Sequence, residues 1–114
     1  MYDFRRFFIN GEWLQPGERR EWEVINPATE EPVGRILLGT REDVDAAVAA
    51  ARAAFDSFAE TSKQERIALL ERIIAVYQCR IDDVARAISD EMGAPMKFAK
   101  RAQAGSGLEH LTTT

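Results

Sequence analysis

The side chains that could carry covalent chemistry are few in this chain of 114 residues, which has one cysteine, Cys79, and one histidine, His110. A thiol nucleophile needs a base within hydrogen-bond reach, and these two residues are far apart in sequence. Arg80 would favour the Cys79 thiolate, but a cysteine inside a helix is more often a small core residue. A thiol enzyme that depends on Cys79 is therefore one alternative, and the substitution Cys79→Ser would test it. His110 fits a partly exposed helical residue, and one cysteine with one histidine cannot build a zinc site.

The segment Gly105-Ser106-Gly107 contains the first two glycines of a dinucleotide-binding fingerprint. That fingerprint works where a strand precedes the glycines and a helix N-terminus follows, so that backbone amides meet a pyrophosphate. Here the residues before Gly105 have a helical pattern, and no third glycine completes the spacing. The pair therefore indicates close helix packing, and the sequence predicts no cofactor-binding residue.

Acidic residues are numerous, and most of them fit solvated faces or the first turns of helices. Glu91 differs because it lies in the last turn before Gly93, where the helix dipole disfavours a carboxylate. Simple exposure of this carboxylate is the interpretation that we favour, and a nearby cation that compensates for the position is the alternative.

The composition restricts the class of protein. The net charge of −4 argues against a nucleic-acid or membrane-surface binder, which needs a basic face. No apolar run is long enough to span a bilayer, and residues 1–7 lack the features of a signal peptide. A single cysteine excludes an internal disulfide. Together these observations predict a cytoplasmic protein with no membrane and no nucleic-acid partner.

Two turn blocks organise the first part of the chain. Asn10-Gly11 between apolar residues predicts a tight hairpin that joins residues 7–9 to residues 12–14. The block Asn26-Pro27 predicts a loop that extends to Pro32, since proline disfavours helix at the residue before it. Strands are expected on either side of this loop, at residues 22–25 and 33–38.

Six of the ten aromatic residues lie within the first 22 positions: Tyr2, Phe4, Phe7, Phe8, Trp13 and Trp22. A compact aromatic cluster inside this domain is one interpretation. The interpretation that we favour is that the hairpin packs on a partner surface not encoded here, since exposed apolar patches mark interfaces.

Helical periodicity begins after Thr40. An apolar stripe predicts a helix over residues 41–58, with Thr40 close to a capping box. Residues 62–65 form a full capping box, S-x-x-E, that opens a long helix ending at Gly93. We expect this helix to bend near residues 79–82 and to be buried on more than one side. Pro95 suits the first position of a third helix.

The order and spacing of several motifs resemble the opening of an aldehyde dehydrogenase superfamily subunit. The matching pieces are Phe8–Trp13, Ile25–Glu30, Asp43–Val48 with Ala51 to Phe55, Glu65-Arg66 with Leu69-Leu70, and Glu91–Pro95. The resemblance implies an α/β family fold in which an N-terminal β-hairpin and short strands are followed by long α-helices that pack on a Rossmann-type domain. Residues 1–114 would then be an incomplete N-terminal part of the cofactor-binding domain.

The family resemblance also implies a reaction. Members oxidise an aldehyde to a carboxylic acid with NAD or NADP, through a cysteine thioester. The nucleophilic cysteine, the general-base glutamate and the cofactor loops of the family come later in the chain, so no residue here is assigned to catalysis and Cys79 is not the nucleophile. The expected partners are the remainder of the subunit, a small aldehyde and further copies in a homodimer or homotetramer. The 114 residues alone are expected to be inactive.

Two sites carry over residue by residue from the resemblance. Many members hold a monovalent cation with backbone oxygens before the Asn-Pro block and with an acid before the glycine turn, and these positions match Val24, Ile25 and Glu91. The helix after Pro95 lines the substrate entrance in relatives, where Ala102 and Ser106 would face the aldehyde. A non-enzymatic helical interaction or assembly module derived from the same segment is the alternative function, and a reading frame that ends naturally after Thr114 would favour it.

Overall fold

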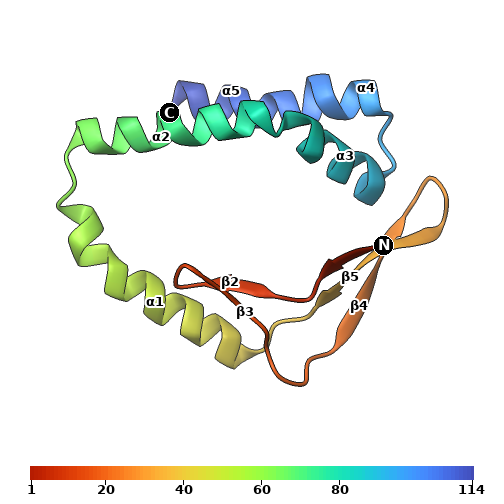
Figure 1. The fold of residues 1–114 in the computed structure, drawn as a ribbon, viewed down its shortest axis with the longest axis horizontal. Helices are drawn as coiled ribbons and strands as arrows, with labels where there is room; N and C mark the ends of the chain where they lie inside the picture. The colour runs from red at the N-terminus through yellow and green to blue at the C-terminus, as the bar shows by residue number, and fades with distance from the viewer. The chain divides into compact units, whose positions relative to one another are not determined.

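The computed structural model describes all residues from 1 to 114, and they form two compact units. The first unit combines residues 1–24 and 32–61, and the second combines residues 25–31 and 62–114. Short strands come first along the chain and long helices follow (Figure 1). This order agrees with the mixed α/β organisation expected from the sequence.

A three-stranded sheet has the order β1-β5-β4, formed by β1 (Tyr2–Phe4), β5 (Glu31–Leu37) and β4 (Glu21–Asn26). β1 runs parallel to β5, with Tyr2 opposite Gly34. A Cβ atom at Gly34 would lie 3.2 Å from the Tyr2 carbonyl oxygen, so glycine permits this close approach. The sequence predicted β4 and β5 within one or two residues but missed β1, because three residues show no periodicity and only the pairing defines them.

The predicted hairpin is confirmed as β2 (Phe7–Ile9) and β3 (Glu12–Leu14), paired antiparallel. Asn10 and Gly11 both have positive φ, 54° and 80°, as a type I′ turn requires. The rings of Phe8 and Trp13 lie opposite each other, 5.2 Å apart between centroids.

The aromatic residues of the first 22 positions do not form a compact cluster. Tyr2 stacks on Phe4, and Phe8 meets Trp13, as two separate ring pairs. Phe8 and Trp13 remain about 60% exposed, and Trp22 is about half exposed. The interpretation as an internal aromatic core is therefore wrong for these residues.

The helix α1 (Arg41–Ala59) begins where predicted. The Asp43 carboxylate accepts the Thr40 backbone N–H at 2.8 Å and binds both Nε and Nη2 of Arg19, at 2.8 and 3.0 Å. These bonds hold the pKa of Asp43 well below its usual range, and the hydrogen bonds from Arg19 lower it most. The apolar stripe of α1 has the predicted spacing, but Val44, Val48, Phe55 and Phe58 are half or more exposed.

The long helix predicted over residues 63–92 consists of α2 (Lys63–Cys79) and α3 (Ile81–Met92), which are separated at Arg80. This break confirms the expected bend. Ser62 and Glu65 form the predicted capping box. The Glu65 N–H donates to Ser62 Oγ at 3.2 Å, and the Ser62 N–H donates to Glu65 Oε2 at 2.7 Å. The expectation that α2 is buried on more than one side is wrong, since no residue of α2 is buried and Val76 is 60% exposed.

The third helical segment has three parts, α4 (Met96–Phe98), a π-helical stretch η1 (Ala99–Ala104) and α5 (Gly105–Thr113). Pro95 is the N-cap residue rather than the first helical residue. α5 lies beside α2 (Figure 1). The fully buried side chains are three alanines, Ala85 of α3 with Ala99 and Ala104 of η1. Their small size lets α3 and η1 pack closely. None of these helices has both the length and the apolar character to cross a membrane.

Candidate functional site

The predicted loop after β4 is ordered by the side chain of Asn26. Asn26 Oδ1 accepts the Ala28 N–H at 2.8 Å, and the Asn26 carbonyl accepts the Glu30 N–H at 2.7 Å. The first bond is the Asx turn that asparagine favours. Glu30 adopts a positive φ of 62°, which closes the loop before β5.

This loop packs against the turn that ends α3, so two motifs far apart in sequence meet within the second unit. Gly93 has a φ of 69°, the left-handed conformation that glycine adopts without strain. A Cβ at Gly93 would lie 3.1 Å from the Ala28 nitrogen and 3.1 Å from Pro27 Cγ. Two hydrogen bonds hold the turn. The Gly93 N–H donates to the Ser89 carbonyl at 2.9 Å, and Ser89 Oγ donates to the Ala94 carbonyl at 2.7 Å. Gly93 is therefore required both by its φ and by the approach of the loop.

The residues matched to a cation site come just before the two chain segments that form this contact. Val24 and Ile25 are consecutive residues of β4, just before the loop, and Glu91 is in the last turn of α3, just before Gly93. The Glu91 side chain is exposed and belongs to none of the ion pairs of the chain. No side-chain cation of this chain therefore compensates Glu91 in its place at the helix C-terminus.

The residues matched to a substrate entrance, Ala102 and Ser106, are both exposed. Ser106 Oγ donates to the Ala102 carbonyl at 2.8 Å, along the same helical segment. Ala102 also lines a hollow of about 460 Å³ together with Lys97, Phe98 and Arg101. The neighbourhood of Ala102 thus combines one aromatic ring, one small side chain and two cationic side chains.

Tyr77 connects α2 to this segment. Its hydroxyl donates to the Ala104 carbonyl at 2.9 Å, at the junction of η1 and α5. A Cβ at Gly107 would lie 2.5 Å from the Tyr77 hydroxyl oxygen. The contact bears out close helix packing for Gly107. Sequence reasoning placed Tyr77 only on an apolar face, and nothing in the pattern revealed its hydrogen bond.

The remaining candidates for chemistry are exposed. Cys79 is the last residue of α2 and faces solvent, so its interpretation as a small core residue is wrong. His110 is exposed on α5, as the sequence predicted. No three His, Cys, Asp or Glu side chains lie close enough together to hold a metal ion.

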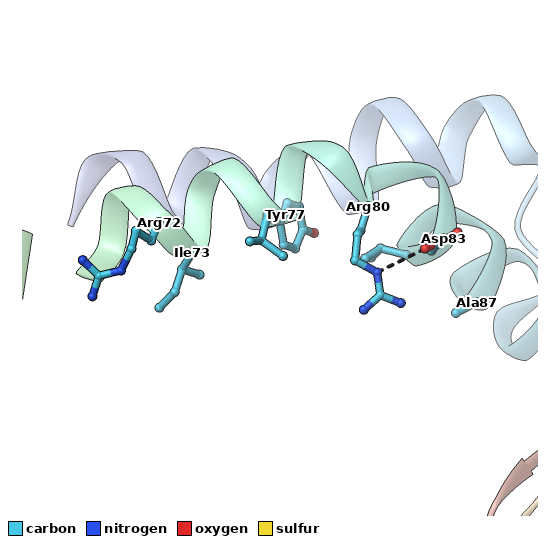
Figure 2. A pocket seen from close by; sticks show the side chains of 8 residues that line it. Arg72, Ile73, Tyr77, Arg80, Asp83 and Ala87 are labelled. Atoms are coloured by element: carbon cyan, nitrogen blue, oxygen red, sulfur yellow. Dashed lines mark hydrogen bonds and ion pairs between the residues drawn. The ribbon is translucent and has the colours of Figure 1, made fainter. Parts of the chain in front are cut away.

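A second hollow, of about 580 Å³, lies along α2 and α3. Figure 2 shows Ile73 and Arg80 extending from α2 and its C-terminal end, with Asp83 and Ala87 beyond them on α3. Arg80 Nε binds Asp83 Oδ2 at 3.2 Å, which leaves the floor of this hollow mainly apolar. Asp83 is the one acidic side chain that lines it, and no cysteine, serine or histidine does.

The amino-acid sequence has a match among known families. The model of the aldehyde dehydrogenase family matches residues 13–113. The chain belongs to the aldehyde dehydrogenase family. This confirms the resemblance drawn from its turn blocks and helix motifs.

Relatives of this aldehyde dehydrogenase segment match nearly all of it. A 3-succinoylsemialdehyde-pyridine dehydrogenase from a Pseudomonas species is 51% identical over 114 residues, which is 99% of this chain and 24% of the relative. The crystal structure of an aldehyde dehydrogenase from Bartonella henselae is 41% identical with a TM-score of 0.96, over 98% of this chain and 24% of that one.

A third relative was crystallised with ligands. It is an aldehyde dehydrogenase from Pseudomonas syringae in complex with NAD+ and octanal, 41% identical with a TM-score of 0.91, over 95% of this chain and 22% of that one. The chain therefore spans about a quarter of the length of these relatives, as their N-terminal portion.

Proposed function

We propose that this chain is the N-terminal portion of an NAD(P)-dependent aldehyde dehydrogenase that oxidises an aldehyde to a carboxylic acid. The observation that carries the proposal is the family match over residues 13–113, together with a TM-score of 0.96 to an enzyme of that name. In this proposal residues 1–114 are part of the cofactor-binding domain.

The contribution of these residues is to the scaffold and not to the chemical step. A cysteine elsewhere in the subunit forms the thioester, and NAD or NADP, when bound, accepts the hydride. The exposed stripes of α1 and α2 are apolar faces that the rest of the subunit would cover, since burial of apolar area drives such packing. Ala102 and Ser106 would face the aldehyde as it enters, and their small side chains leave room there.

A monovalent cation is the second part of the proposal. The backbone oxygens of Val24 and Ile25 and the carboxylate of Glu91 are hard oxygen ligands, the type that such cations prefer. Support comes from the packing of Ala28 on Gly93, because this contact joins the segment after Ile25 to the turn after Glu91. The cation would also compensate the unfavourable place of Glu91 at a helix C-terminus.

The proposed partners are a small aldehyde, the remainder of the subunit and other copies of it in a homodimer or homotetramer. We propose a cytoplasmic location, on the composition and the single cysteine.

An activity comparison tests the proposal. The full subunit that carries this segment should reduce NAD or NADP in the presence of an aldehyde, followed by the absorbance of the reduced cofactor. The 114-residue chain alone should not, because it has no nucleophile with a base. Activity of the isolated chain, or a natural reading frame that ends after Thr114, would overturn the proposal and favour an assembly module.

A further inference from the structure

The segment that carries Ala102 and Ser106 is not a regular α-helix. The Gly105 N–H donates to the Lys100 carbonyl, five residues earlier, which is the spacing of a π-helix. A residue inserted into a helical turn rotates everything beyond it by about 100°, since an α-helix has 3.6 residues per turn. The π-helical stretch η1 therefore decides which face of α5 continues the face that bears Ala102.

A π-helical stretch is uncommon, so contacts outside the segment are needed to hold it. On one side, Ala99 and Ala104 are fully buried against Ala85 of α3. On the other side, the Tyr77 hydroxyl binds the Ala104 carbonyl at 2.9 Å. Gly107 leaves room for that hydroxyl, since a Cβ there would lie 2.5 Å from it. Tyr77 thus holds the last carbonyl of η1 at the point where α5 begins.

We propose that Tyr77 is a positioning residue that fixes the π-helical register of residues 99–104 and thereby sets which side chains line the aldehyde entrance. The proposal rests on the proposed function, because it deepens the assignment of Ala102 and Ser106. Tyr77 does not touch the aldehyde. It acts through the Ala104 carbonyl, and it should affect the end of the aldehyde farthest from the reacting carbon.

The test uses the full subunit with the substitution Tyr77→Phe, which keeps the ring and removes the hydrogen bond. Steady-state kinetics are measured with octanal and propanal as the long and short substrates. We expect the KM for octanal to rise about threefold or more, the effect of one lost hydrogen bond. The kcat, the KM for propanal and the KM for NAD should change by less than about twofold.

Gly107→Ala gives a reciprocal test. The added Cβ displaces the Tyr77 hydroxyl, so this substitution should raise the KM for octanal as Tyr77→Phe does. In the Tyr77→Phe background the hydroxyl is absent and the nearest ring atom, Cζ, would lie 3.1 Å from the added Cβ, so Gly107→Ala should add less there than in the wild type, and the double-mutant cycle should show coupling. Thr112→Val is the matched control, because its hydroxyl bonds carbonyls of α5 alone, including Leu108 at 3.1 Å.

Hydrogen exchange of residues 99–108 gives a readout that is independent of activity. Tyr77→Phe should speed exchange there, and Thr112→Val should not. Equal changes in KM for octanal and propanal, additive effects of the two substitutions, or unchanged exchange would each overturn the positioning role. A subunit that shows the exchange effect without any aldehyde-dependent reduction of NAD would contradict the proposed function and leave the control of the helix register by Tyr77 supported.

Discussion

Among single residues, Asp43 shows how one side chain serves two structural purposes. Its carboxylate caps the start of α1 through the Thr40 N–H and also binds Arg19 from the segment before β4. The sequence indicated the first function from the spacing of Thr40 and Asp43. The pairing with Arg19 spans 24 residues, and only the tertiary structure brings the two together.

The substitution Asp43→Asn should lower the stability of the protein at neutral pH. The folded-state pKa of Asp43 lies below its unfolded value of 3.8, so its stabilisation is present above that pH and is lost as the pH falls through the folded pKa. The stability difference between wild type and variant should therefore shrink below about pH 4. Urea unfolding followed by circular dichroism from pH 7 to pH 2 measures it.

Asp45→Asn is the control for this experiment, since Asp45 forms only an exposed pair with Arg41 at 3.7 Å. It should change the urea midpoint little at any pH. A difference for Asp43→Asn that stays constant down to pH 2 would contradict the linkage to its carboxylate.

Gly93 gives a second prediction at this scale. Gly93→Ala should destabilise the protein by about 1–3 kcal/mol, because alanine is strained at positive φ and its Cβ would meet Ala28 and Pro27. Thermal or urea unfolding measures the loss. Gly17→Ala is the matched control, since Gly17 has no positive φ and open space around it. That substitution should be neutral or stabilise by less than about 1 kcal/mol, and equal effects at the two glycines would refute the argument.

Glu91 carries the prediction about the cation. The thermal midpoint of the full subunit should be higher in potassium or sodium chloride than in choline chloride at equal ionic strength, because bound cation stabilises the folded state. Glu91→Gln should remove most of that difference. Glu109→Gln, which changes another exposed acid of the second unit, should preserve it. The same midpoint in all salts would contradict the cation site.

The sequence predicted secondary-structure elements correctly where a short motif, such as a turn or a helix cap, defines them. The Asn10-Gly11 turn, the cap at Ser62 and the end of α3 at Gly93 were all predicted, since each depends on neighbours in sequence. The π-helical stretch η1 was not, because its residues have ordinary helical propensity. Its register depends on Ala85 of α3 and on Tyr77 of α2, which are remote in the chain.

Ser62→Ala tests the capping box as an element. The Glu65 N–H would lose its acceptor at the start of α2, so we expect a destabilisation of about 1 kcal/mol. Ser57→Ala is the control, because its hydroxyl bonds the Ala54 carbonyl within α1 and caps nothing. Unfolding in urea compares them. An equal and small loss for both serines would show that the cap contributes no special stability.

On the scale of the whole molecule, the described residues expose much apolar surface. Trp13, Val76, Phe55 and Phe8 are each at least 60% exposed, while the buried hydrophobic core is three alanines. A chain that spans a quarter of its relatives is consistent with faces that other parts of a subunit cover.

This exposure predicts the behaviour of the isolated chain. The 114 residues alone should bind a hydrophobic dye such as anilinonaphthalene sulfonate and increase its fluorescence, because exposed apolar surface attracts such ligands. The full subunit should bind much less dye per residue. Equal dye fluorescence per residue in the two proteins would contradict the view that the rest of the subunit covers these faces.

The sequence by itself determined the family, the hairpin, the start of α1 and α2 and the end of α3, because turn chemistry and capping act over a few positions. Only the tertiary structure decided that the Asn26 loop packs on Gly93, that Tyr77 holds the Ala104 carbonyl and that the apolar stripes of α1 and α2 remain uncovered. The reason is physical. Periodicity shows which face of an element is apolar, but the partner of that face, or the acceptor of a hydroxyl, is set by the spatial approach of residues that are distant in the chain.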